Sequence, residues 1–125
     1  MQVKIDTKEK FHAITINESN LAANMTADLE QCLTPILEKD VKNVVLILKD
    51  TQNVDEAAAD SLVRIQQSFY DAGSSFVICE LTPEVEKSLE SNGLLELMNV
   101  TPTESEAWDI VQMEEIEREL LNGPD

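Results

Sequence analysis

The stretch from Val44 to Ser61 constrains the fold more than any other part of the chain. It begins with the apolar, largely β-branched run VVLIL, which is typical of a strand buried on both faces of a sheet. The polar loop KDTQNV follows, and then Asp55 precedes Glu56 and a run of alanines, a pattern that favours the start of a helix. Because sites in open α/β sheets gather where strands end and helices begin, we expect the functional surface around Asp55 and Glu56.

The remaining apolar patterns alternate between strands and helices. Other strands are predicted at Val3–Ile5, Phe11–Ile16 and Phe76–Cys79, with a weak one at Leu97–Val100. Other helices are predicted from Met25 to Ile36 with a disturbance at Pro35, from Asp55 to Gly73, from Thr82 to Gly93, and from the capping box Thr103-x-x-Glu106 onward. Two buried strands joined by a helix imply parallel pairing through a right-handed crossover, while the first two strands form a hairpin. The fold class is therefore α/β, a mixed sheet packed with helices and followed by an extended C-terminal helix.

The composition fits one domain with an unusual charge. The chain has 125 residues, of which 25 are Asp or Glu and 9 are Lys or Arg, giving a net charge of −16. Nucleic acid is a poor candidate partner, because binding it depends on neutralising phosphates with Lys and Arg. The charge favours solubility and a partner with a basic surface.

No targeting signal or metal motif stands out. The N-terminal segment MQVKIDTKEK lacks the apolar core of a signal peptide, and no apolar run approaches the length of a membrane helix. Cys32 and Cys79 lie in apolar patterns without metal or redox spacing. We expect a cytoplasmic protein with buried, reduced thiols, no cofactor, no metal and no direct insertion into a membrane.

Motifs for catalysis are scarce. His12 lies between apolar neighbours in a strand, which indicates a structural histidine, and no Gly-rich phosphate loop, GxSxG, HExxH or CxxC occurs. We therefore expect no enzymatic activity, with an enzyme that uses clustered carboxylates as a less favoured alternative.

The segment Ala59–Leu62 contains the D-S-L found at the cofactor-bearing serine of acyl carrier proteins. However, Ser61 falls well inside a predicted helix, where we expect it to be half-buried.

The last helix carries two apolar stripes. Ala107, Ile110 and Val111 form one, and a second stripe is rotated well around the axis: Met113, Ile116 and Leu120. One flat core cannot easily bury both, so we divide the chain into a domain at 1–112 and an acidic helical extension and tail at 113–125. Either the end of the helix is loosely covered, or it offers an apolar face to a partner or to a second copy in a weak homodimer.

The order of elements from Asn20 to about Val111 resembles the STAS domain, the fold of bacterial anti-sigma factor antagonists. The resemblance rests on Leu21 and Leu29 around the first helix, VVLILKDTQNVD, ICELTPEV at 78–85, the turn SNGL at 91–94, and the final helix start at 103–107. It implies reversible binding to an anti-sigma factor or related kinase-like protein in a partner-switching pathway. In that family the kinase phosphorylates a serine just after an aspartate at the start of the second helix.

This chain departs from the family at that position. The family's D-S-S-G-L corresponds to Asp55-Glu56-Ala57-Ala58-Ala59, so the aspartate is kept but a glutamate stands at the acceptor serine. Where the family usually has an aspartate after the first-helix leucine, this chain has Ala22. Either Glu56 is a fixed charge that imitates the phosphorylated state, or it only favours the helix dipole, by about 0.3–1 kcal/mol. Thr51 and Ser61 are speculative substitute phosphosites.

The resemblance also implies the location of the binding face. It comprises the loop after the buried strand, the exposed face of the next helix, and the turn at 20–24: Asn20, Asn24, Thr51, Asn53, Asp55, Glu56, Asp60, Val63 and Gln67. A second role within the same fold is a STAS subunit of a membrane transporter complex.

Overall fold

A computed structural model describes residues 1–121 of the chain. The strands are β1 Val3–Thr7, β2 His12–Ile16, β3 Asn20–Leu21, β4 Val44–Ile47, β5 Asn53–Val54, β6 Phe76–Cys79 and β7 Val100–Thr101. The α-helices are α1 Thr26–Leu33, α2 Glu56–Asp71, α3 Pro83–Ser91 and α4 Glu104–Leu121. Short 3₁₀ turns lie at Ala23–Met25, Thr34–Glu38 and Leu95–Leu97.

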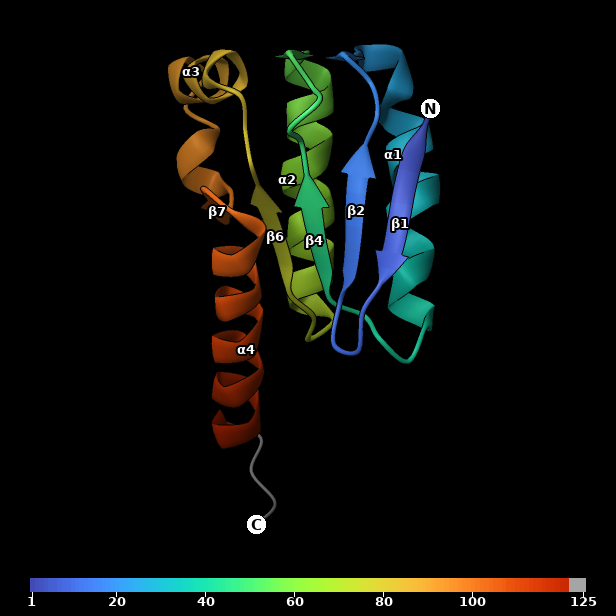
Figure 1. Ribbon diagram of the computed structural model, residues 1–125, viewed down its shortest axis with the longest axis vertical. Helices are drawn as coiled ribbons and strands as arrows, with labels where there is room; N and C mark the ends of the chain where they lie inside the picture. The colour runs from blue at the N-terminus through green and yellow to red at the C-terminus, as the bar shows by residue number, and fades with distance from the viewer. Residues whose placement is uncertain (122–125) are drawn as a thin grey trace.

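The main sheet has the strand order β1-β2-β4-β6-β7 (Figure 1). β1 pairs with β2 antiparallel, and the other neighbouring pairs are parallel. The central strands β4 and β6 are adjacent and parallel, with Val45 opposite Val77, and every residue in both strands is buried. The predicted mixed α/β sheet, its front hairpin and its parallel central pair are therefore confirmed.

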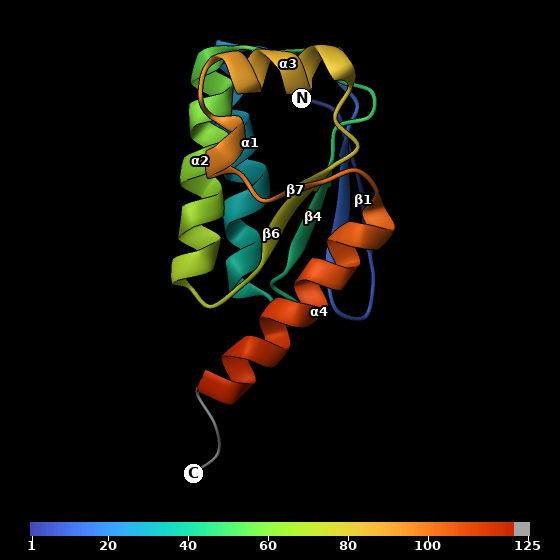
Figure 2. The same ribbon diagram turned by 90° about the vertical axis from the view of Figure 1, so that its left-hand side faces the viewer.

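Helices cover both faces of the sheet (Figure 2). α1, α2 and α3 lie on one side, where the larger core contains Ile14, Leu46 and Ile78. α4 lies on the other side, where the smaller core contains Val45, Val77, Cys79, Ala107 and Val111. Successive residues of β4 and β6 thus face opposite cores, which explains why these strands are apolar throughout.

Helix ends follow their local sequence signals. α1 ends at Leu33, and Pro35 falls in the 3₁₀ turn that continues from it, as expected for a residue that removes a backbone donor. Gly73 and Gly93 follow α2 and α3 with φ of 74° and 71°, values that favour glycine. At α4 the Thr103 hydroxyl accepts a hydrogen bond from the Glu106 N–H, which is one half of the predicted capping box.

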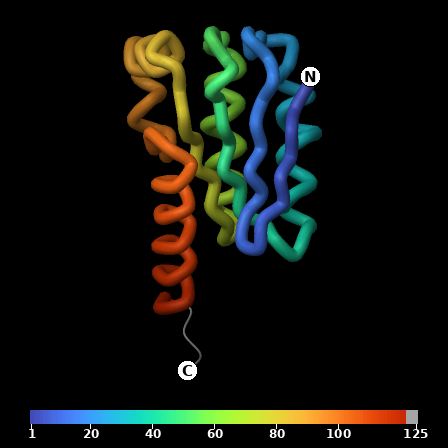
Figure 3. Tube along the Cα trace, in the orientation of Figure 1, coloured from blue at the N-terminus to red at the C-terminus, as the bar shows by residue number. Residues whose placement is uncertain are grey.

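The edge strand near the C-terminus differs from the sequence prediction, whereas the extended C-terminal helix is present. Leu97 belongs to a 3₁₀ turn, and the edge strand β7 is confined to Val100–Thr101 instead of 97–100. α4 runs as one helix across the proposed boundary at 112/113, and its second half extends past the end of the sheet (Figure 3). Residues 122–125, the end of the proposed acidic tail, lie outside the described residues.

Candidate protein-binding surface

The candidate surface lies at the edge of the sheet where the parallel strands end. Because β2, β4 and β6 are parallel, their C-terminal ends meet at one edge, shown at the top of Figure 1. The loops at 17–19, 48–52 and 80–82 leave from this edge. This is the usual position of a binding site in an open α/β sheet.

A small second sheet joins two of these loops. β3 pairs with β5 in parallel, with Asn20 opposite Asn53, and the Asn53 Nδ2 donates to the Asn20 Oδ1 at 2.8 Å. The Ser19 carbonyl accepts hydrogen bonds from the N–H groups of both Gln52 and Asn53, at 2.7 and 3.1 Å. The turn at 20–24 and the loop before α2, which are far apart in the sequence, are therefore held side by side.

Asp55 fastens the same two segments from the other side. It is the N-cap residue of α2 with extended backbone, but its side chain makes no hydrogen bond to its own helix. Instead the Asp55 carboxylate accepts the N–H of Ala23 at 2.9 Å, while the Asp55 N–H donates to the Leu21 carbonyl at 2.9 Å. One residue thus fixes the start of α2 to the start of the 3₁₀ turn at 23–25.

Thr51 lies beneath the surface and not on it. Its side chain is fully buried, its hydroxyl donates to the Glu18 carbonyl at 2.9 Å, and its carbonyl accepts the Thr82 hydroxyl at 3.0 Å. The Thr82 hydroxyl also accepts the N–H of Val85 at the start of α3. Thr51 therefore ties the three loops together, and as a buried, bonded hydroxyl it is not accessible for phosphorylation.

The other residues of the candidate surface are open to solvent in different degrees. Val63 and Asp60 are half-buried, and six are exposed: Asn20, Asn24, Asn53, Asp55, Glu56 and Gln67. Positions 56, 60, 63 and 67 are spaced so that they share one face of α2. The Gln67 amide donates to Asp71 at 2.9 Å, one turn further along the helix. The structure thus places the predicted residues on the paired β3 and β5 segments, in the turn at 20–24 and along one face of α2, with Thr51 buried beneath the loops.

Glu56 is the first residue of α2 and is exposed. Its carboxylate has no hydrogen bond or ion pair within residues 1–121. The two ion pairs formed within these residues, Lys8–Asp6 and the N-terminal amine with Asp28, do not involve Glu56. An acid at this position is favoured by the partial positive charge of the helix N-terminus. Glu56 therefore presents a negative charge that no neighbouring side chain neutralises.

Ser61 is more buried than the sequence suggested. Its exposed fraction is 0%, and its hydroxyl has no hydrogen-bond partner among the described residues. The expectation of a half-buried serine is wrong, because this position faces the core between Ala58 and Leu62. A serine enclosed in this way cannot carry a cofactor arm or accept a phosphate while the protein is folded, which removes both the acyl-carrier interpretation and the substitute phosphosite.

Two contributors to the surface were missed from the sequence. Glu80 has a φ of 57°, in the left-handed region, at the point where the chain leaves β6; no residue preference signals this, because glutamate seldom adopts it. Thr82 was expected only as a helix cap, and its bond to the Thr51 carbonyl is a long-range contact without a sequence pattern. Glu18, Ser19 and Ala23 also take part through backbone hydrogen bonds. Such bonds do not depend on the side chain, so the sequence carries no signal for them.

His12 and Cys79 are structural parts of the core. The His12 ring is buried, with Nδ1 at 2.9 Å from the Thr7 hydroxyl and Nε2 at 2.9 Å from the Val41 carbonyl, to which it donates. Burial, with smaller contributions from Glu80 and Glu104, raises the pKa of the Cys79 thiol to about 12, so the thiol stays protonated. Cys32 is only half-buried, although burial also raises its pKa.

Residues 1–121 contain neither a set of metal ligands nor a membrane-spanning helix. The described carboxylates, histidine and thiols include no group of three placed to hold a metal ion. Within the same residues, no helix is both long and apolar enough to cross a bilayer.

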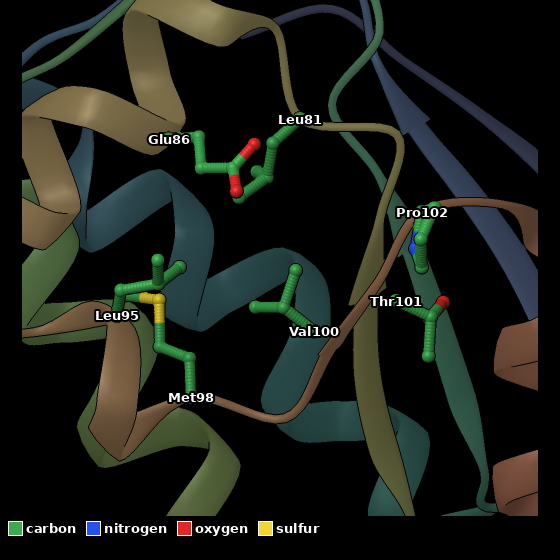
Figure 4. Close-up of a pocket in the computed structure, with 7 residues that line it drawn as sticks. All are labelled: Leu81, Glu86, Leu95, Met98, Val100, Thr101 and Pro102. Atoms are coloured by element: carbon green, nitrogen blue, oxygen red, sulfur yellow. The ribbon is translucent and has the colours of Figure 1, made fainter.

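An open pocket of about 440 Å³ lies beside the candidate surface, between α3 and β7. Leu81, Leu95, Met98 and Val100 give it an apolar lining, and Figure 4 shows the Glu86 carboxylate near Leu81. It is separate from the face of α2 that carries Glu56.

A model of the STAS domain matches residues 2–107, which is most of the chain. The chain therefore belongs to the STAS domain family. Solved structures share this fold at low sequence identity. A putative anti-sigma factor antagonist from Thermotoga maritima has a TM-score of 0.75 at 20% identity, covering 88% of this chain and 94% of that one.

Two further solved structures illustrate the range of proteins that carry the fold. A serine-to-glutamate variant of RsbS from Moorella thermoacetica has a TM-score of 0.73 at 23% identity, covering 94% of this chain and 99% of that one. A sulfate transporter family protein from Wolinella succinogenes has a TM-score of 0.71 at 14% identity, covering 87% and 90%. The same fold thus occurs in a putative anti-sigma factor antagonist and in a sulfate transporter family protein.

Proposed function

We propose that this STAS domain is a regulatory protein-binding module of the anti-sigma factor antagonist type. Its partner is an anti-sigma factor or related kinase-like protein, its role is non-catalytic, and its site of action is the bacterial cytoplasm. The observation that carries the proposal is the exposed Glu56 at the start of α2, next to loops that Asp55 and Thr51 hold in place. The family membership and the fold of the solved relatives support the same role.

The architecture of the surface suits binding without large rearrangement. Side chains from α2 and from the turn at 20–24 are joined by the β3–β5 pairing and by the Asp55–Ala23 hydrogen bond. A surface that is ordered before binding loses less conformational entropy on association. The exposed amides of Asn20, Asn24 and Gln67 supply donors and acceptors, and Val63 supplies a half-buried apolar contact.

An experiment that introduces a positive charge tests the location of the surface. In Gln67→Arg a bulky cation replaces an exposed amide on α2, and Gln31→Arg makes the same change on exposed α1 as the matched control. With the purified kinase-like protein of the same host, calorimetry should show at least about tenfold weaker binding for Gln67→Arg, equivalent to about 1.4 kcal/mol. Equal affinities for the two variants would contradict the proposed surface.

The identity of residue 56 determines whether the module can be switched. A carboxylate is not a phosphate acceptor for such a kinase, so incubation with the kinase and ATP should leave position 56 unmodified. If Glu56 imitates phosphoserine, Glu56→Ser should bind the partner more tightly and become phosphorylatable. Unchanged binding of Glu56→Ser would show that Glu56 acts only at the helix start. Glu56→Gln separates charge from size, and Glu90→Gln, an exposed change on α3, is the control.

A STAS subunit of a membrane transporter is the second candidate function. The observation that favours it is the shared fold of the sulfate transporter family protein from Wolinella succinogenes. Binding to a transporter component, with no measurable binding to a kinase-like protein, would select this candidate over the first.

A further inference from the structure

A second surface lies on α4, away from the loops at the strand ends. Its apolar side chains are exposed, with fractions of 54% for Met113, 56% for Ile116 and 78% for Leu120. The opposite side of the helix holds Ala107 and Val111, both fully buried. These three exposed residues therefore contribute nothing to the core of the domain, and as a contiguous apolar patch they indicate an interaction site.

The spacing of these residues is that of a coiled-coil seam. Met113, Ile116 and Leu120 are separated by three and then four residues, the spacing of the core positions of a heptad. The residues that flank such a core in the same heptad are Glu117 and Glu119, both exposed. We call these five residues the α4 seam.

The charges at the α4 seam determine what can cover it. In paired helices the flanking positions of one helix face those of the other and select the partner by charge. A second copy would place Glu117 and Glu119 against the same acids, and each chain already carries a net charge of −16. Like charges at these positions destabilise the pair, which argues against the homodimer considered from the sequence.

We propose that the α4 seam binds a basic amphipathic helix of another protein, with apolar residues against the seam and Lys or Arg facing the flanking glutamates. This is the helix-in-groove type of recognition, reduced to one exposed helix face. A seam of so few turns implies a weak, reversible contact, because short helix pairs are marginal in water. This proposed contact goes beyond the proposed function, since it assigns a second partner to the protein.

The two surfaces lie at opposite edges of the sheet. α4 begins next to β7, whose Thr101 is paired with Cys79 at the C-terminal end of β6. Near its other end, Arg118 donates to the Ser75 hydroxyl at 3.2 Å, just before β6 begins. The helix therefore runs from the edge that carries the loops toward the opposite edge and beyond it (Figure 2). A partner on the α4 seam and another at Glu56 can bind at the same time.

Designed peptides provide the test. The first probe is a labelled helical peptide of about three heptads with leucine at the core positions and lysine at the flanking positions. The second is identical except for glutamate at the flanking positions. Fluorescence anisotropy with the full chain should show binding of the lysine peptide only, and Met113→Ser with Ile116→Ser should weaken it at least about tenfold.

A charge-matched pair of variants separates the seam from general attraction to an acidic chain. Glu117→Gln with Glu119→Gln should weaken the lysine peptide severalfold, whereas the control Glu90→Gln with Glu96→Gln, equal in charge and exposed elsewhere, should leave it unchanged. Equal losses in both pairs, or binding that is insensitive to Met113→Ser with Ile116→Ser, would overturn the proposal. The proposal would also be overturned if sedimentation showed a dimer of the parent chain and a monomer of the variant with Met113→Ser and Ile116→Ser. That result would mean that a second copy of the chain covers the α4 seam.

Discussion

The Asp55 carboxylate accepts a hydrogen bond from the backbone N–H of Ala23, 32 residues earlier in the chain, at 2.9 Å. An aspartate at the start of a helix usually caps that helix. Here the side chain turns to another segment, so the residue that begins α2 also positions the turn at 23–25. The Asp55 carboxylate therefore helps to set the shape of the proposed binding surface, together with the β3–β5 pairing.

Asp55→Ala should lower the free energy of unfolding by about 1 kcal/mol, because it leaves the Ala23 N–H without its acceptor. Partner binding should fall more than stability does, since the turn at 20–24 loses its attachment. Asp55→Asn keeps an oxygen that can accept the same bond and is the matched control. Denaturant titration and calorimetry measure the two effects, and equal behaviour of both variants would show that the bond is unimportant.

Ser61→Ala should raise the free energy of unfolding by about 1 kcal/mol, because it removes a buried hydroxyl that has no partner among the described residues. Alanine is also the better helix former. Ser68→Ala on the exposed side of the same helix is the control, since the Ser68 hydroxyl already donates to the Arg64 carbonyl. Thermal and urea unfolding measure the difference between the variants. A loss of stability in Ser61→Ala would mean that the hydroxyl has an unseen partner.

Cys79 should make stability depend on pH in the alkaline range. Its pKa is raised from 9.0 to about 12, so the unfolded chain ionises this thiol before the folded protein does. The stabilising contribution is complete below about pH 9 and declines as the pH rises toward 12. Urea unfolding at several pH values should show a steeper decline for the parent protein than for Cys79→Ala.

Thiol alkylation gives an independent check on the same environment. In the folded protein at pH 8, Cys79 should resist alkylation, because only the thiolate reacts. Cys32, which is half-buried, should react faster. Mass spectrometry of the labelled peptides distinguishes the two sites, and rapid labelling of Cys79 would contradict its placement.

Replacing both Met113 and Ile116 with lysine should change the free energy of unfolding by less than about 0.5 kcal/mol, as is usual for surface positions. Val111→Lys, two residues before Met113, should unfold the domain because Val111 is fully buried. Circular dichroism during urea titration compares the two. If the double variant unfolds, the seam belongs to the core.

Much of the fold could be predicted because it rests on strong local patterns. The runs at 44–48 and 76–79 are apolar throughout because each strand faces two cores, and this is visible in the sequence. Gly73 and Gly93 stop their helices at the expected places through their positive φ. The exposure of Met113 and Ile116 was also predictable, because their helical angle differs from that of Ala107 and Val111.

The predictions failed where long-range contacts override local preference. The weak strand placed at 97–100 shifted to Val100–Thr101, because only these residues pair with β6. The β3–β5 pairing consists of two short segments with no detectable periodicity. The surface could be placed near Asp55, but the buried position of Thr51 and the left-handed backbone of Glu80 follow from how three loops meet.

The two outer strands of the sheet have a consequence for how this protein can assemble. β1 carries exposed Lys4 and Asp6 along its length, and β7 is two residues long and is followed directly by Pro102, which has no N–H to donate. Charges, short length and proline each discourage a foreign strand from adding to an edge. Backbone pairing between molecules is therefore disfavoured at both outer strands. Contacts with other proteins are left to side chains, which can be replaced one at a time without exposing the sheet.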